Sequence, residues 1–257
     1  MLTIDNITKR FNAGTVDEAT VFEHFSFAVQ PHEFVSVIGS NGSGKTTLLN
    51  LICGSDRPDE GHIRFDGRDI TAMSEHNRAR FIGRVFQDPK MGTCSHLTIM
   101  ENMALADNKN RAFGLTPGVN RRRADAYRTL LEECGMGLEN RMNTLVGSLS
   151  GGQRQALALV IANMTNIDLL ILDEHTAALD PRSSETIMRL TDKLVGGKQI
   201  TTVMVTHNLR FAIEYGTRLV MMHEGRCILD LKGEEKIAAK VDDLLKVFNE
   251  ISIEAGN

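Results

Sequence analysis

The sequence lacks the features that mark several common classes of protein. Its cysteines, Cys53, Cys94, Cys134 and Cys227, lie far apart and form no C-x-x-C pair. Neither a disulfide framework nor a zinc site is indicated, and reduced thiols are expected. No apolar run approaches the length of a membrane span, and residues 1–10 lack the apolar centre of a signal peptide. The sequence therefore favours a cytoplasmic chain.

A net positive charge and internal repeats are also absent. Twenty-nine lysines and arginines face 33 aspartates and glutamates, which gives a net charge of −4. This balance argues against a surface that coats nucleic acid, so no nucleic-acid partner is expected. With 257 residues the chain can bury a full core, either as one α/β domain with an insertion or as two subdomains.

The clearest feature that is present is the glycine-rich segment Gly39–Thr46, which fits the pattern G-x-x-x-x-G-K-[ST]. Residues 34–38 read as a buried parallel strand before it, and residues 47–53 read as a helix after it. Glycines let backbone N–H groups surround a polyphosphate, and the start of the helix adds partial positive charge. Lys45 is expected to reach the β- and γ-phosphates, and the Thr46 hydroxyl to coordinate Mg²⁺. The predicted nucleotide-binding residues are Gly39, Ser40, Asn41, Gly42, Ser43, Gly44, Lys45, Thr46 and Thr47.

The N-terminal segment predicts a small antiparallel sheet. Residues 2–7 and 22–29 read as two strands joined by a polar loop, and residues 61–67 read as a strand that ends in an Asp-Gly turn. Phe11 lies at the mouth of the polar loop. Its ring would either stack on a nucleotide base or belong to the core, and the residues alone favour neither reading.

The pattern changes between Lys90 and about Val146. The period predicts helices over 98–106 and 124–134, with a loop at Gly114–Gly118, and therefore an inserted helical subdomain. Residues 121–123, three arginines, are expected to open the longer helix as a solvated charged face rather than a binding patch. Just before this segment, Gln87 follows the predicted strand 82–86, where its amide could reach a metal or a water.

Two strand-to-helix segments carry further candidate residues. Ser150-Gly-Gly-Gln153 has the form of a capping box before the apolar helix 156–164, yet Gly151 and Gly152 also expose backbone N–H groups suited to a phosphate. Asp173 and Glu174 end the predicted strand 168–174, at a sheet edge where ligands bind. There Asp173 could hold the Mg²⁺ shell and Glu174 could deprotonate the attacking water.

The last third of the chain supplies two more candidates. Asp180 and Pro181 form a helix N-cap and first helical position. Residues 199–206 read as the last buried parallel strand, and His207 at its end is a candidate to hydrogen-bond the γ-phosphate or the attacking water. A closing hairpin over 219–230 and an amphipathic helix over 241–248 follow.

Together these residues resemble the ATP-binding cassette family of ATPases over nearly the whole chain. The phosphate loop, Gln87, the signature Leu149-Ser-Gly-Gly-Gln153, the Asp173-Glu174 pair and His207 stand in the family's order. The resemblance implies an α/β P-loop NTPase core with an antiparallel β-subdomain, over 1–89 and 155–257, and a helical subdomain over 90–154. It also implies a single ATPase domain that uses ATP and Mg²⁺.

The resemblance further implies partners and residue roles. Two cassettes pack head to tail, so Ser150–Gln153 of one chain would close on ATP held by the other. Asp180 is counted among the nucleotide-binding residues, with a role at the catalytic interface. Phe11 matches the aromatic residue that stacks on adenine. Gln87 matches a metal-contacting and catalytic residue that couples the site to an integral membrane permease, whose coupling helix would meet residues 90–110. The chain would then lie at the cytoplasmic face of the membrane.

Two departures and several alternatives accompany this resemblance. The family's usual proline after the catalytic glutamate is His175, a titratable group that could make activity pH-sensitive, and its usual serine before Ala-Leu-Asp is Ala177. A combination of three segments looks like a branch of bacterial importers that work with a permease and a substrate-binding protein, some associated with aromatic amino acids. The segments are Gly14-Thr15, Leu138–Arg141 and Asp173–Asp180. A soluble cassette ATPase without transport activity, or an exporter ATPase, remains the alternative. One cassette and no sustained heptads argue against the translation and DNA-repair types.

Overall fold

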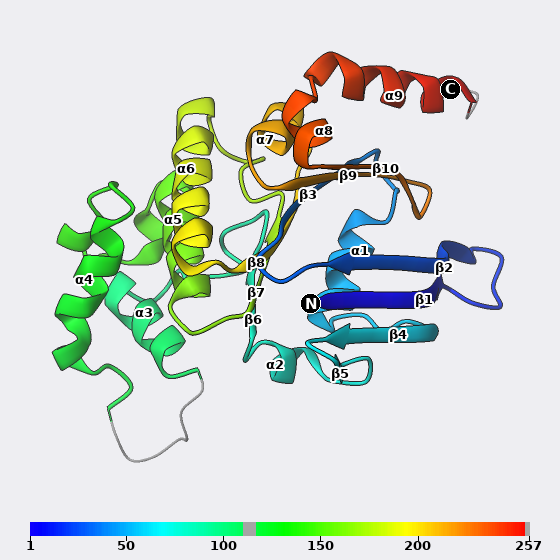
Figure 1. The fold of residues 1–257 in the computed structure, drawn as a ribbon. Coiled ribbons are helices and arrows are strands. Elements are labelled where there is room, and N and C mark those ends of the chain that lie inside the picture. Colours follow the sequence, from blue (N-terminus) through cyan, green and yellow to red (C-terminus); the bar gives the residue numbers. More distant parts are fainter. Residues whose placement is uncertain (110–116, 255–257) are drawn as a thin grey trace. The chain divides into compact units, whose positions relative to one another are not determined.

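The computed structural model describes residues 1–109 and 117–254, and its contacts divide the chain into two compact units (Figure 1). The first unit comprises Met1–Ala79 and Ile200–Asn257, and the second comprises Arg80–Gln199. The predicted helical segment 90–154 falls wholly inside the second unit. Most of the predicted loop Gly114–Gly118, residues 114–116, lies outside the described residues.

An antiparallel sheet forms the N-terminal part of the first unit, as predicted. Its strands, in the order β2-β1-β4-β5, are β2 (Ala19–Val29), β1 (Leu2–Phe11), β4 (Glu60–Phe65) and β5 (Arg68–Asp69). Strand β2 buries Phe22, Phe25 and Phe27. Phe25 and Phe27 follow the alternation of a strand, whereas an irregularity in the register separates them from Phe22. The ring centroids of Phe22 and Phe25 lie 4.5 Å apart. This aromatic row gives the sheet the apolar face that a half-buried sheet needs.

The first unit also contains a mainly parallel set of strands around β3 (Phe34–Gly39). The strands β8 (Thr201–Val205) and β9 (Arg218–His223) flank β3, and both pair with it in parallel. Strand β10 (Arg226–Lys232) pairs antiparallel with β9. The prediction that 199–206 is the last parallel strand is therefore wrong, because β9 follows it. The hairpin of β9 and β10 could be predicted because a tight turn joins the two strands. The parallel pairing of β9 with β3 could not, because it joins residues far apart in the sequence.

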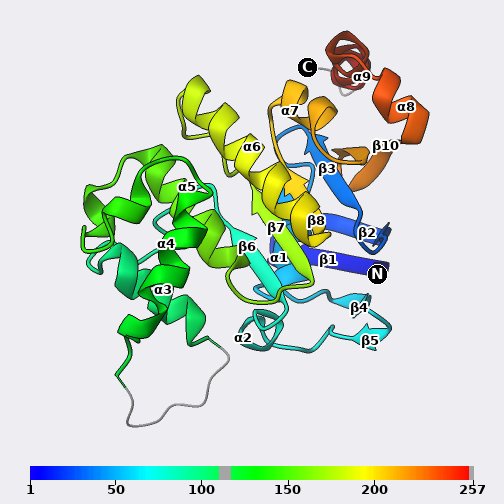
Figure 2. The same ribbon diagram turned by 60° about the vertical axis from the view of Figure 1, so that its left-hand side comes forward.

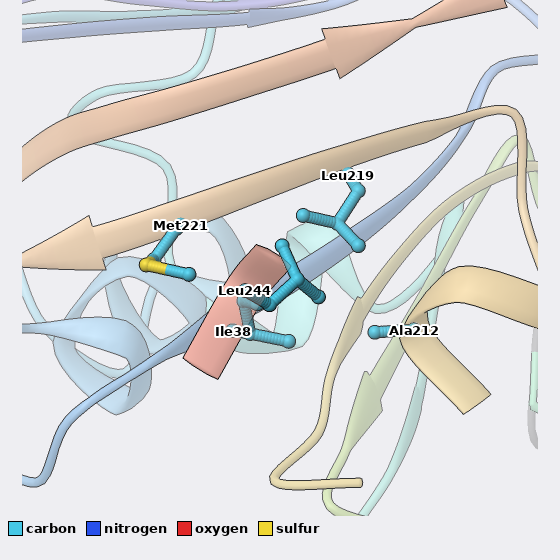
Figure 3. Close-up of a cluster of buried hydrophobic side chains, with 5 residues drawn as sticks. All are labelled: Ile38, Ala212, Leu219, Met221 and Leu244. Atoms are coloured by element: carbon cyan, nitrogen blue, oxygen red, sulfur yellow. The ribbon is translucent and has the colours of Figure 1, made fainter. Parts of the chain in front are cut away.

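Helices complete the first unit. They are α1 (Lys45–Cys53), α2 (Glu75–Arg78), α7 (Leu209–Glu214), α8 (Gly233–Ala238) and α9 (Val241–Glu254). Figure 3 shows a core cluster in which Ile38 of β3 and Leu219 and Met221 of β9 meet Ala212 of α7 and Leu244 of α9. Each of these side chains is at most 1% exposed. The long tail helix is thus anchored by Leu244 to the strand that leads into the glycine-rich loop.

A buried arginine joins α2 to the end of α1. Arg78 is 0% exposed, and its guanidinium donates to the carbonyl oxygens of Leu51 (2.6 Å) and Ile52 (2.9 Å) in the last turn of α1. It also donates to the carbonyls of Ile70 and Met73. A cation at a helix C-terminus opposes the negative end of the macrodipole and satisfies carbonyls that have no partner within the helix.

The described residues of the second unit form two parallel strands and four α-helices. Strands β6 (Ile82–Val85) and β7 (Leu169–Asp173) pair in parallel. In Figure 2, α3 (Ile99–Asp107), α4 (Ala124–Glu132) and α5 (Gly151–Asn163) gather together, and α6 (Pro181–Lys198) lies along α5. The arginines at 121–123 form a 3-10 turn before α4 rather than its first turn, and Arg123 pairs with Asp107 at 2.9 Å.

No helix among the described residues combines the length and the apolar character that crossing a membrane requires.

Candidate active site

The glycine-rich loop joins the end of β3 to the start of α1 in the first unit. Gly44 is the N-cap of α1 and adopts φ 97°, and Gly42 adopts φ 78°, values that favour glycine. A Cβ at Gly44 would lie 2.9 Å from the Phe22 ring, so β2 packs closely against the loop. Because Gly44 offers no capping side chain, the first amides of α1 are suited to receive an anion. The loop therefore fits a phosphate group.

Lys45 lies folded over this loop. Its ammonium donates to the carbonyl oxygens of Gly39 (2.8 Å) and Ser40 (2.7 Å) and to the Ser43 hydroxyl (3.3 Å). The side chain is only 6% exposed, so its charge is held at the centre of the loop. A cation held there attracts anionic phosphate, and the Thr46 side chain beside it is exposed. The predicted phosphate-binding residues are thus brought together by this one loop.

The turn between β9 and β10 supports the same loop. The sequence did not reveal this contact. His223 Nδ1 lies 3.2 Å from the Ser40 hydroxyl, and the Gly225 amide donates to the Ser43 carbonyl at 3.2 Å. A Cβ at Gly39 would lie 2.2 Å from the Met222 carbonyl oxygen. Because β9 runs parallel to β3, the carboxyl ends of both strands share one edge, and the turn after β9 meets the loop after β3. Knowledge of that pairing is the signal that would have identified His223.

His207 and Phe11 also belong to the first unit. Strand β8 is parallel to β3, so His207 follows β8 at the edge where the glycine-rich loop follows β3. Phe11 ends β1 opposite Ala19, and the ammonium of Lys9 lies 5.0 Å from its ring centroid. The ring is partly exposed and is therefore not a core residue. Its stacking on a base, like the role of His207, stays a prediction.

The acidic pair lies in the second unit, at the carboxyl edge of β6 and β7. Val85 pairs with Leu172, so Gln87 and Glu174 follow their strands at the same edge. Asp173 forms an ion pair with Arg84, Oδ2 to Nη2 at 2.8 Å. Glu174 adopts φ 46°, a left-handed conformation that costs a non-glycine residue roughly 1–3 kcal/mol. The role of Glu174 as the base stays a prediction.

His175, next to Glu174, is buried and packs toward α6. It is 2% exposed, and its Nε2 lies 3.1 Å from the Thr191 hydroxyl, which itself donates to the Ile187 carbonyl. The Nε2–H of His175 therefore donates to Thr191. Burial lowers the pKa of His175 to about 4. The residue is uncharged near neutral pH, so the expected pH-sensitivity of activity through His175 is not supported there.

The signature segment begins α5 as the predicted capping box. The Ser150 hydroxyl accepts from the Gln153 amide, and the Gln153 side chain accepts from the Ser150 amide, both at 3.3 Å. A Cβ at Gly152 would lie 2.9 Å from the Ser183 hydroxyl, so the start of α6 packs against this segment. Asp180 caps α6 by accepting from the Ser183 amide at 3.0 Å, and hydrogen bonds from Ser183 lower the pKa of Asp180. The capping roles are confirmed, and contact with a second chain's nucleotide stays a prediction.

The predicted metal ligands offer chemistry that suits Mg²⁺. Thr46, Gln87 and Asp173 present a hydroxyl, an amide oxygen and a carboxylate, all hard oxygen donors. Within the described residues no group of three or more histidines, cysteines or acids could hold a metal by itself. Mg²⁺ is commonly bound by one or two protein oxygens together with substrate phosphates, and this donor set fits that pattern.

Comparison with known proteins assigns the family. Residues 22–177, more than half of the chain, match the family described as ABC transporter. The chain belongs to this family and is an ATP-hydrolysing cassette with its α/β fold.

Individual relatives cover nearly all of the chain. It is 44% identical, over 96% of its length and 98% of the relative's, to a tyrosine transport ATP-binding protein of Clostridioides difficile. It is 34% identical to the thiamine import ATP-binding protein ThiQ of Shigella flexneri, over 84% of this chain and 88% of that protein. A dimeric post-hydrolysis structure of the cassette MJ0796, bound to ADP and Pi, superposes with a TM-score of 0.77 at 30% identity, covering 90% and 98% of the two chains.

Proposed function

We propose that this chain is the ATPase subunit of an importer for an amino acid of the tyrosine type, acting at the cytoplasmic face of the membrane with a separate permease. The observation that carries the proposal is the 44% identity to a tyrosine transport ATP-binding protein over 98% of that protein. A substrate-binding protein outside the membrane would deliver the amino acid. The cassette itself selects no solute, so uptake depends on partners that this chain drives.

We propose the following roles in hydrolysis. The amides of Gly39–Thr47 and the ammonium of Lys45 bind the ATP phosphates, and Phe11 stacks on the adenine. Glu174 orients the attacking water and takes its proton, while His207 donates to the γ-phosphate. Thr46, Asp173 and Gln87 would hold Mg²⁺, which would neutralise charge that develops on the phosphates.

We propose that two copies of the chain pair when they bind ATP. The related cassette MJ0796 is dimeric after hydrolysis, with ADP and Pi bound. Gly151, the first residue of α5, is exposed, and the start of a helix favours an anion. In the pair, this segment and Asp180 of each copy would meet the nucleotide bound by the other copy.

A groove in the second unit supports docking of the permease. It is a cavity of about 560 Å³ between β6, residues 91–94, α3 and α5. Two large apolar side chains that line it are exposed, Met91 by 69% and Leu105 by 59%. An amphipathic helix places apolar anchors into a groove of this kind. We propose that a short cytoplasmic helix of the permease binds there.

The variant Glu174→Gln tests the reaction and the transport function together. The amide keeps the size of the side chain but accepts no proton, so we expect ATP to bind while turnover falls by at least about 100-fold. The purified variant should elute as a dimer with ATP, and cells carrying it should lose uptake of labelled tyrosine.

A matched variant, Lys45→Ala, should instead weaken ATP binding itself, measured by titration. Hydrolysis by Glu174→Gln at the parental rate would remove Glu174 as the base. Unimpaired tyrosine uptake would contradict the transport assignment, and loss of solute efflux instead of uptake would identify an exporter.

A further inference from the structure

Arg84 connects the predicted metal carboxylate to the groove of the second unit. On β6, Arg84 pairs with Ile171 of β7, and Asp173 lies two residues beyond Ile171. Since side chains alternate along a strand, Arg84 and Asp173 share one face of the strand pair. Their ion pair measures 2.8 Å, and the two side chains are only 13% and 15% exposed. This shielding from water makes the attraction stronger than that of a surface pair.

The same arginine lines the groove. Its guanidinium carbon lies 4.7 Å from the centroid of the Phe86 ring, a cation–π contact that steers the side chain. Within the described part of the chain, the charged residues that line the groove are Arg84 and Lys109, and no acid lines it. A partner that places a carboxylate in this groove would therefore meet two lining cations, one of which, Arg84, already holds the Asp173 carboxylate.

Arg84 and Mg²⁺ would compete for one carboxylate. A metal that binds Asp173, directly or through water, brings a double positive charge toward the guanidinium, so either the ion pair weakens or metal binding is penalised. A second carboxylate close to Arg84 reverses this penalty because it gives the guanidinium another counter-ion. The effect is reciprocal: whatever favours metal binding also favours the partner's carboxylate.

We propose that Arg84 is a positioning residue that restrains Asp173 in the isolated chain and releases it for Mg²⁺ when an acidic side chain of the membrane partner enters the groove. This inference rests on the proposed role of Asp173 as a metal ligand. It gives the groove a chemical specificity, for a helix that carries a carboxylate, and it ties docking to the metal site through one side chain.

The first test measures how strongly Mg²⁺ tightens ATP binding. The dissociation constant of ATP is determined in EDTA and in excess Mg²⁺ for the parent chain, Arg84→Gln and Arg84→Lys. The Mg²⁺ enhancement is the dissociation constant in EDTA divided by that in Mg²⁺. We expect this ratio to be about tenfold larger in Arg84→Gln than in the parent chain, since removing one close charge has effects of this order. Arg84→Lys keeps the charge and should stay near the parental ratio. An unchanged or smaller ratio in a folded Arg84→Gln would overturn the proposal.

A second variant leaves Arg84 and Asp173 intact. Gly92 lines the groove, and a Cβ there would lie 3.5 Å from Ala158 Cβ and 4.0 Å from the Phe86 ring, ordinary contact distances. Gly92→Glu therefore places a carboxylate near the Phe86 ring, which Arg84 contacts. Gly92→Gln is the uncharged control. We expect Gly92→Glu to raise the Mg²⁺ enhancement of ATP binding several-fold over Gly92→Gln. The difference should vanish when each is combined with Arg84→Gln.

The results separate this inference from the proposed function. A chain that binds no ATP in either buffer would contradict the nucleotide site itself. Normal ATP binding, with equal Mg²⁺ enhancement in Gly92→Glu and Gly92→Gln, would contradict the proposed role of Arg84 and leave the nucleotide site unaffected. Equal enhancement by Gly92→Glu with and without Arg84 would assign the effect to a general charge in the groove and would likewise overturn the proposal.

Discussion

Arg78 shows how one side chain stabilises the helix behind the glycine-rich loop. Its guanidinium supplies hydrogen bonds to carbonyls from three segments, including Leu51 and Ile52 of α1, Ile70 and Thr71. The sequence did not reveal this role, because an arginine in a short polar helix is ordinarily exposed. The burial follows from the way α2 turns back on the end of α1, which local periodicity does not report.

Arg78→Met should therefore destabilise the protein strongly. The variant leaves several buried carbonyls without donors, so we expect the free energy of unfolding to fall by at least about 3 kcal/mol, measured by urea denaturation. Arg78→Lys retains the charge but not the planar set of donors, so its free energy of unfolding should lie between those of the parent chain and Arg78→Met. Arg80→Met, at an exposed neighbouring arginine, is the control and should change stability by less than about 0.5 kcal/mol. Equal effects at both positions would contradict the assigned role.

His175 makes stability depend on pH at a position where the sequence suggested an effect on activity. Burial lowers its pKa in the folded chain from 6.5 to about 4. Between these values the unfolded chain binds a proton that the folded chain does not. The contribution of His175 to the free energy of unfolding is therefore complete above pH 6.5 and is lost as the pH drops toward 4. This contribution alone should remove about 2 kcal/mol between pH 7 and pH 5.

The variant His175→Gln isolates that contribution, because glutamine does not titrate and keeps an amide that can reach Thr191. Denaturation at pH 7 and pH 5 should show a smaller loss in the variant than in the parent, by about 2 kcal/mol. The same loss in both proteins would show that His175 does not titrate as its burial requires.

At the scale of elements, the glycine-rich loop is supported from two directions. Phe22 of β2 packs on Gly44, and the β9–β10 turn meets the loop through His223 and Gly225. Gly225 adopts φ 70°, and a Cβ there would lie 2.0 Å from the Val21 carbonyl oxygen. No side chain fits this position without moving the turn. A distant hairpin therefore helps to hold the geometry of the phosphate site.

Gly225→Ala tests this support. Because the turn must shift, we expect a loss of about 1–3 kcal/mol in unfolding free energy and a weaker affinity for ATP, measured by denaturation and by titration. Gly196→Ala in α6 is the matched control, since a Cβ there meets nothing within 4 Å. It should stabilise the chain by about 0.5–1 kcal/mol and leave ATP affinity unchanged. Full affinity in Gly225→Ala would show that the turn does not support the loop.

The elements also show what the sequence could and could not predict. The loop after β3, the capping box of α5 and the N-cap of α6 follow from local chemistry, so residues 39–46, 150–153 and 180 were identified correctly as structural features. The parallel pairing of β9 with β3, and with it the position of His223, depends on residues far apart in the chain. Likewise the Arg84–Asp173 ion pair requires the register of β6 against β7.

At the scale of the whole molecule, the order of motifs was sufficient to predict the family. The match over residues 22–177 and the similarity to the MJ0796 cassette confirm the fold and ATP hydrolysis. The solute is a separate question, because the proposed function assigns its selection to other chains. A solute of the tyrosine type stays a proposal, which draws on the 44% identity to a tyrosine transport ATP-binding protein.

The capping box bears on how two such molecules would pair. The hydroxyl oxygen of Ser150 accepts a hydrogen bond from the backbone N–H of Gln153. The hydroxyl proton takes no part in this bond and remains able to donate. One atom can thus fasten the start of its own helix and still offer a donor to a neighbour's phosphate oxygen. Alanine at this position would lose both abilities at once, so impaired pairing in such a variant would need to be separated from simple fraying of α5.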